Sequence, residues 1–162
     1  MPSQSFIRIF EEHYTVFRTL FAESVTNPSQ EVIHCMRREI KYLIALIHFV
    51  EELAPDNQEN DLLNSIKRIG KKSGKVRDWQ IIRMLMSSRP EYDNSSIMTE
   101  IDAKILDKQQ RYRDFAKEVT IRLHPSDGLT LDQIPLSPAS FIIYIGQMHH
   151  RIVVMLNKGE QN

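Results

Sequence analysis

Apolar side chains recur every three or four residues along most of the chain, which is the spacing of one face of an α-helix. This pattern predicts five helices, which cover about residues 3–24, 28–53, 61–88, 96–123 and 138–157. Pro125, Asp127-Gly128 and Pro135 predict a loop over 124–137, before the last helix. The sequence therefore predicts an all-α protein: a four-helix bundle with an additional apolar C-terminal helix, in a single domain over 1–162.

Each of the first four predicted helices has one apolar stripe that is expected to face the core. The stripe residues are Phe6, Phe10, His13, Phe17 and Leu20 in the first helix, Ile33, Met36, Ile40, Leu43, Ile47 and Val50 in the second, Leu62, Ile66, Ile69, Val76 and Met84 in the third, and Ile97, Ile101, Ile105, Lys108, Tyr112, Phe115 and Val119 in the fourth.

Three residues bear on where these helices begin and bend. Pro28 suits the first turn of the second helix, because its missing N–H has no partner there in any helix. Gly70 and Gly74 lie inside the third helix, where each costs about 1 kcal/mol relative to alanine. Such residues favour a kink or a local break in that helix.

The last predicted helix, over 138–157, is apolar on much of its circumference. One stripe suits packing against its own bundle, and it is made by Phe141, Ile145, Met148 and Ile152 with Met155 or Leu156. Other apolar residues lie off this stripe, namely Ile142, Ile143, Val153 and Val154. A two-fold partner would cover them, so we expect a homodimer through this helix.

The composition, with 41% hydrophobic and 26% charged residues, is typical of a soluble globular domain. No apolar run approaches the roughly 20 residues that span a bilayer, so we expect no membrane association. The single cysteine, Cys35, excludes an internal disulfide framework and indicates a reducing, cytoplasmic setting.

The common catalytic motifs are absent from the sequence. It contains no Gly-rich phosphate loop, no G-x-S-x-G, no H-E-x-x-H and no EF-hand loop. No nucleophile–base pair and no metal-ligating constellation stands out either. We therefore expect neither enzyme activity nor a cofactor nor a bound metal.

The net charge is zero, with 21 basic and 21 acidic residues, but the basic residues are concentrated in one segment. Residues 62–89 hold eight basic side chains and one acid, Asp78. This distribution does not favour a nucleic-acid-binding domain that is basic throughout. It favours a local face that attracts anions.

Two predicted helices carry this basic character on flanks away from their apolar stripes. The second helix contributes His34, Arg37, Arg38 and Lys41, and the third contributes Lys67, Arg68, Lys71, Lys72 and Lys75. Each flank could be a charged face exposed to solvent. On the second helix, Glu31 and Glu39 would partly neutralise the basic charge. The near absence of acids on the third helix favours an anion instead, since like charges one turn apart repel each other.

Arg77 differs from the other basic residues of the third helix. It lies nearer the apolar side, where a guanidinium needs a partner such as Asp78 or an acid from another helix.

Two motifs of these helices resemble signatures of the CHAD family, the conserved histidine α-helical domain. The first runs from Glu31 to Lys41 and contains a histidine with basic residues three and seven places later, which are His34, Arg37 and Lys41. The second is an apolar-basic-basic-apolar run that leads to Gly-x-Val-Arg-Asp, from Ile66 to Asp78. Since one His-x-x-Arg signature is present, the chain resembles a half-length member of the family.

The resemblance implies a helical fold around a basic channel and the binding of inorganic polyphosphate. We therefore expect non-catalytic binding of polyphosphate or a similar phosphate-rich polyanion. The expected site residues are His34, Arg37, Arg38, Lys41, Lys67, Arg68, Lys71, Lys72, Lys75 and Arg77. Two alternatives stay open: a nucleic-acid-associated helical protein that uses the same basic face, and a helical protein–protein interaction module.

Overall fold

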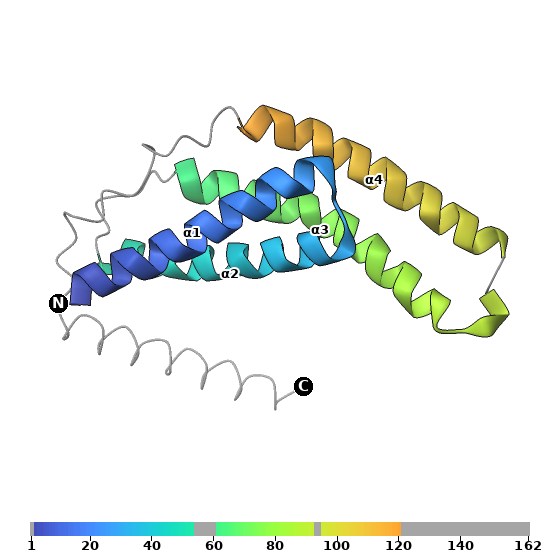
Figure 1. Cartoon of the computed structure of the whole chain (residues 1–162), viewed down its shortest axis with the longest axis horizontal. Helices are drawn as coiled ribbons and strands as arrows, with labels where there is room; N and C mark the ends of the chain where they lie inside the picture. The colour runs from blue at the N-terminus through green and yellow to red at the C-terminus, as the bar shows by residue number, and fades with distance from the viewer. Residues whose placement is uncertain (1, 54–60, 93–94, 121–162) are drawn as a thin grey trace, which may run out of the picture.

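The computed structural model describes residues 2–53, 61–92 and 95–120, and these residues form four long helices and one short one (Figure 1). The long helices are α1 (Pro2–Thr26), α2 (Gln30–Leu53), α3 (Asp61–Ser87) and α4 (Ser96–Thr120), and a single 3₁₀ turn, η1, covers Pro90–Tyr92. This part of the chain contains no strand, so the all-α prediction is confirmed. None of its helices is both long enough and apolar enough to cross a membrane.

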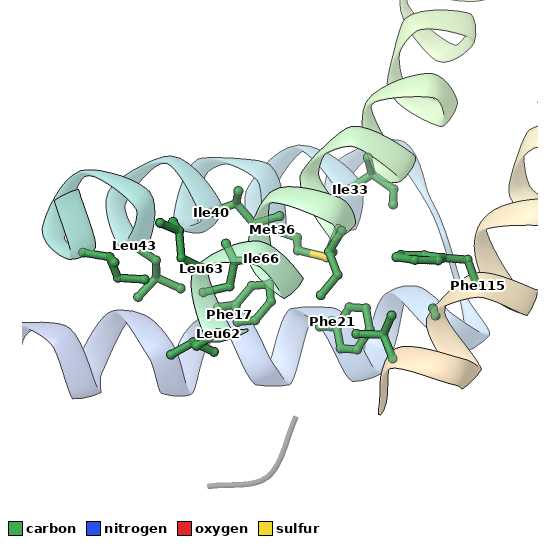
Figure 2. Close-up of a cluster of buried hydrophobic side chains, with 14 of the residues drawn as sticks. Phe17, Phe21, Ile33, Met36, Ile40, Leu43, Leu62, Leu63, Ile66 and Phe115 are labelled. Carbon is green, nitrogen blue, oxygen red and sulfur yellow. The ribbon is translucent and has the colours of Figure 1, made fainter. Parts of the chain in front are cut away.

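The four long helices pack in the order in which they follow one another along the chain. α1 lies against α2, α2 against α3 and α3 against α4, while contacts between α1 and α4 close the bundle. The predicted stripe of the second helix is confirmed, because all six of its members are buried. Figure 2 shows Ile33, Met36, Ile40 and Leu43 of this stripe in one buried cluster with Phe17 and Phe21 of α1 and Ile66 of α3.

The predicted stripes of the third and fourth helices are wrong at one residue each. Met84 on α3 is 48% exposed and Ile97 on α4 is 46% exposed. The C-terminal part of α3 and the N-terminal part of α4 extend beyond the ends of α1 and α2 (Figure 1). Among the described residues, α3 and α4 pack mainly against each other in this extension, so part of their apolar surface stays exposed.

The second helix begins two residues later than predicted. α2 starts at Gln30, and the Oγ of Ser29 accepts a hydrogen bond of 3.2 Å from the backbone N–H of Val32. Ser29 is therefore the N-cap residue and Pro28 precedes it, because a serine side chain can satisfy an N–H that a proline could not.

The third helix does not break at its glycines. α3 is one continuous helix from Asp61 to Ser87. Both glycines lie against α2, and the close packing that they allow there offsets their low helix propensity. The loop predicted over 124–137 and the C-terminal helix predicted over 138–157 lie outside the described residues, as does the dimer interface expected on that helix.

Candidate anion-binding site

The contact between α2 and α3 is built on the two glycines of α3. A Cβ on Gly70 would lie 3.2 Å from Cγ2 of Ile40, and a Cβ on Gly74 would lie 2.7 Å from Nη1 of Arg37. Gly70 lies beside Ile40 and Gly74 beside Arg37, so the residue number falls on α2 as it rises on α3, and the two helices are antiparallel neighbours. The same register places Lys41 on α2 level with the turn between Lys67 and Lys71 on α3.

Arg37 joins the two helices directly. Its side chain is half-buried, and Nη1 donates a hydrogen bond to the backbone oxygen of Gly70. The guanidinium occupies the space that the missing side chain of Gly74 leaves open. Part of the hydrogen-bonding capacity of Arg37 is therefore used within the protein, and its other N–H groups are what it can offer to an anion.

Four other predicted site residues flank this contact on its solvent side. With 100° between successive residues, Lys67 and Lys71 lie beside the line of Gly70 and Gly74, on the side away from the core. His34 and Lys41 occupy the corresponding flank of α2, and all four side chains are exposed. The α2–α3 seam, as we call His34, Arg37, Lys41, Lys67 and Lys71, is therefore a basic strip formed by two helices.

Arg68 and Lys72 lie on the opposite flank of α3, toward α4. The guanidinium carbon of Arg68 is 5.5 Å from the ring centroid of Phe115, and Nζ of Lys72 is 5.4 Å from the same centroid. Both distances are within the range of a cation–π contact. The sequence places five cations on one face of α3. In the structure Lys67 and Lys71 lie on the flank toward α2, and Arg68 and Lys72 lie on the flank toward α4. Exposed Lys75 lies farther along the helix.

Arg38 is the one predicted site residue with an ion pair in the part of the chain that the structure describes. Its Nε is 3.5 Å from Oε1 of Glu39, whose carboxylate is buried. The other carboxylate oxygen, Oε2, is 2.7 Å from Nδ1 of His13 on α1. Glu39 therefore partly neutralises the basic strip of α2, as the sequence suggested, and also ties α2 to α1.

Arg77 does not have the acidic partner that the sequence led us to expect. Its Nη1 is buried and has no hydrogen-bond partner among the described residues, and no carboxylate of these residues forms an ion pair with it. The register of the two helices places Arg77 level with His34, one turn beyond Gly74. A buried cationic N–H without an acceptor is costly.

Sequence reasoning missed the contribution of Phe115. Its position on the apolar stripe of the fourth helix predicted burial, which is confirmed, but the spacing of apolar residues carries no signal for the two cations over its ring.

The described residues contain no group of three or more histidine, cysteine or acidic side chains that could hold a metal ion. Comparison with models of protein families, with curated proteins and with solved structures found no match.

Proposed function

We propose that this chain is a non-catalytic protein that binds inorganic polyphosphate or a similar phosphate-rich polyanion at the α2–α3 seam. The observation that carries the proposal is a set of exposed cations without acidic partners. Lys41, Lys67, Lys71 and Lys75 form no ion pair with any described residue, although the chain as a whole is neutral.

A linear polyanion fits this arrangement for a physical reason. Cations one helical turn apart repel each other, and a ligand with a charge on every repeat relieves several repulsions at once. Lysines supply point charges along the strip, while the half-buried guanidinium of Arg37 supplies directed N–H donors to phosphate oxygens. The likeness of His34, Arg37 and Lys41 to the CHAD signature supports the same ligand, and the single cysteine supports a cytoplasmic location.

Two observations bear on the alternative functions. A nucleic-acid-binding protein is expected to present aromatic rings beside its cations for base stacking. Here Phe115 is buried under Arg68 and Lys72, and the exposed ring of Tyr42 stacks on His13 toward α1. The interaction-module alternative is favoured by the exposed Leu85 and Leu106 on the extension of α3 and α4.

The test is calorimetric titration of the full chain with long-chain polyphosphate, compared with orthophosphate, which has a single phosphate group. Polyphosphate should bind more tightly, and its affinity should fall steeply as salt rises, because several cations must act together. Lys67→Gln with Lys71→Gln should weaken binding at least tenfold. Arg8→Gln, which removes a charge from an exposed pair on α1, is the matched control and should leave binding unchanged. Equal binding by the double variant and the native chain would contradict the proposal.

We also propose that the chain forms a homodimer through residues 138–157, whose sequence carries more apolar surface than one bundle can cover. A dimer would place two basic seams in one particle. Sedimentation equilibrium at micromolar concentration should give twice the 19.0 kDa of one chain, and a mass of one chain would exclude the dimer.

A further inference from the structure

A groove lies where α3 and α4 extend past the turn between α1 and α2. Its walls come from Ser29 and Gln30 at the start of α2, from α3, and from α4, and its volume is about 420 Å³. That volume is within the range of small-molecule sites. The groove shares no residue with the α2–α3 seam.

Gln80 on α3 lines this groove, and one atom of its amide has no partner among the described residues. The side chain is only 6% exposed, and its Nε2 donates to the backbone oxygen of Pro28 at 3.1 Å. Since a carbonyl oxygen only accepts, the amide nitrogen of Gln80 and not its oxygen faces Pro28. The same carbonyl accepts a second hydrogen bond of 3.1 Å from Nε2 of Gln109. Oε1 of Gln80 is left as a buried acceptor with no donor among the described residues. A native protein seldom leaves such an atom unpaired.

The mouth of the groove carries one charge of each sign. Nε of Arg83 donates to Oδ1 of Asp102 at 2.6 Å, and both side chains are about half exposed. This hydrogen bond raises the pKa of Arg83, so the guanidinium stays charged. The bond leaves the terminal amino groups of Arg83 as donors and Oδ2 of Asp102 as an acceptor. A lone anion or a lone cation in the groove would therefore meet one charge of its own sign.

Apolar atoms line the rest of the groove. Met84 is a flexible, polarisable side chain, and Ile105 forms a buried wall beside it. A ligand that satisfies the whole lining would need a negative group, a positive group with N–H donors, and a short apolar body.

We propose that this groove binds a small zwitterion, a free α-amino acid with an apolar side chain. The carboxylate would accept hydrogen bonds from the free N–H groups of Arg83 and from the hydroxyl of Ser29. The ammonium group would donate to Oδ2 of Asp102, and the Gln80 side chain would have to turn its buried Oε1 toward the groove to accept as well. The side chain would lie along Met84 and Ile105, where removing its apolar surface from water favours binding.

The experiment compares leucine with two molecules that each lack one of its charges. Isocaproate keeps the carboxylate and the apolar body, and isoamylamine keeps the amine and the apolar body. In calorimetric titration of the full chain, leucine should bind at least tenfold more tightly than either. In an NMR titration, the side-chain amide signals of Gln80 and Gln109 should shift with leucine.

Two variants make the result specific. Asp102→Asn removes the acceptor charge and should weaken leucine binding at least tenfold. Asp107→Asn is the matched control, since it removes a charge from another ion pair of α4, with Lys108 and Arg111, outside the groove. Equal affinity for leucine and isocaproate, full affinity in Asp102→Asn, or no leucine binding at millimolar concentration would each overturn the proposal. Polyphosphate binding is measured separately and does not depend on this groove.

Discussion

The guanidinium of Arg37 lies where a side chain on Gly74 would have to be. A Cβ added to Gly74 would come within 2.7 Å of Nη1 of Arg37, and the same nitrogen donates to the backbone oxygen of Gly70. The pair therefore sets how closely α2 approaches α3, and with it the separation between Lys41 on one helix and Lys67 on the other. Arg37 is as much a part of the packing of the bundle as of its anion-binding face.

Gly74→Ala is expected to destabilise the protein, even though alanine is the better helix former by about 1 kcal/mol. The new methyl group would expel the guanidinium of Arg37 and break its hydrogen bond to α3. We expect a net loss of about 1–2 kcal/mol in the free energy of unfolding, measured by urea denaturation. Gly70→Ala is the matched control: its Cβ would meet side-chain atoms of Ile40, Cγ2 at 3.2 Å and Cδ1 at 3.9 Å, so the net change should be close to zero. A Gly74→Ala protein as stable as the native chain would contradict the role given to Arg37.

The two flanks of α3 are expected to contribute unequally to polyanion binding. Lys67 and Lys71 border the seam, whereas Arg68 and Lys72 lie over Phe115. Each phosphate contact that is lost should reduce the slope of log affinity against log salt by about 0.7–0.9. Lys67→Gln with Lys71→Gln should therefore flatten the slope more than Arg68→Gln with Lys72→Gln. The reverse order would show that the polyanion binds on the side of α3 that faces α4.

Glu39→Gln tests the buried carboxylate between α1 and α2. Glutamine keeps the size of the side chain but removes the charge that faces His13 and Arg38. We expect the free energy of unfolding to fall by about 1–3 kcal/mol at neutral pH. Glu51→Gln, in the more exposed pair with His48, should change it by less than about 1 kcal/mol. Equal effects of the two substitutions would show that burial does not increase the contribution of Glu39 to the free energy of unfolding.

The buried phenol of Tyr112 should make the free energy of unfolding depend on pH in the alkaline range. Burial raises the pKa of its phenol to about 12, although the hydrogen bond with Ser24, 2.6 Å long, acts in the opposite direction. The unfolded chain ionises its tyrosines near pH 10. The native state thus holds a proton that the unfolded state releases, so this contribution is complete below about pH 10 and is lost between about pH 10 and 12.

The measurement is urea unfolding between about pH 9 and pH 11.5, for the native chain and for Tyr112→Phe. The native chain should lose stability with pH more steeply than the variant, with a difference of about 2 kcal/mol between about pH 9 and pH 11.5. Ultraviolet titration should also show one of the five tyrosines ionising after the others. Identical slopes for the two proteins would exclude this role of Tyr112.

The sequence by itself determined the helices and most of their buried faces. Apolar spacing located the four described helices to within a few residues. One face of each helix must be buried, and this requires apolar residues at every third or fourth position of the sequence. It failed at Met84 and Ile97, since periodicity shows which residues share a face but not where a neighbouring helix ends.

Only the tertiary structure decided what surrounds each cation. The sequence placed Lys67, Arg68, Lys71 and Lys72 on one face, but the positions of α2 and α4 divide them between an open seam and the ring of Phe115. Likewise, nothing in the spacing of Arg37 and Gly74 indicates that the guanidinium fills the space beside the glycine. The physical reason is that helical periodicity describes a single helix, whereas charge pairing and close packing depend on side chains that other helices bring into contact.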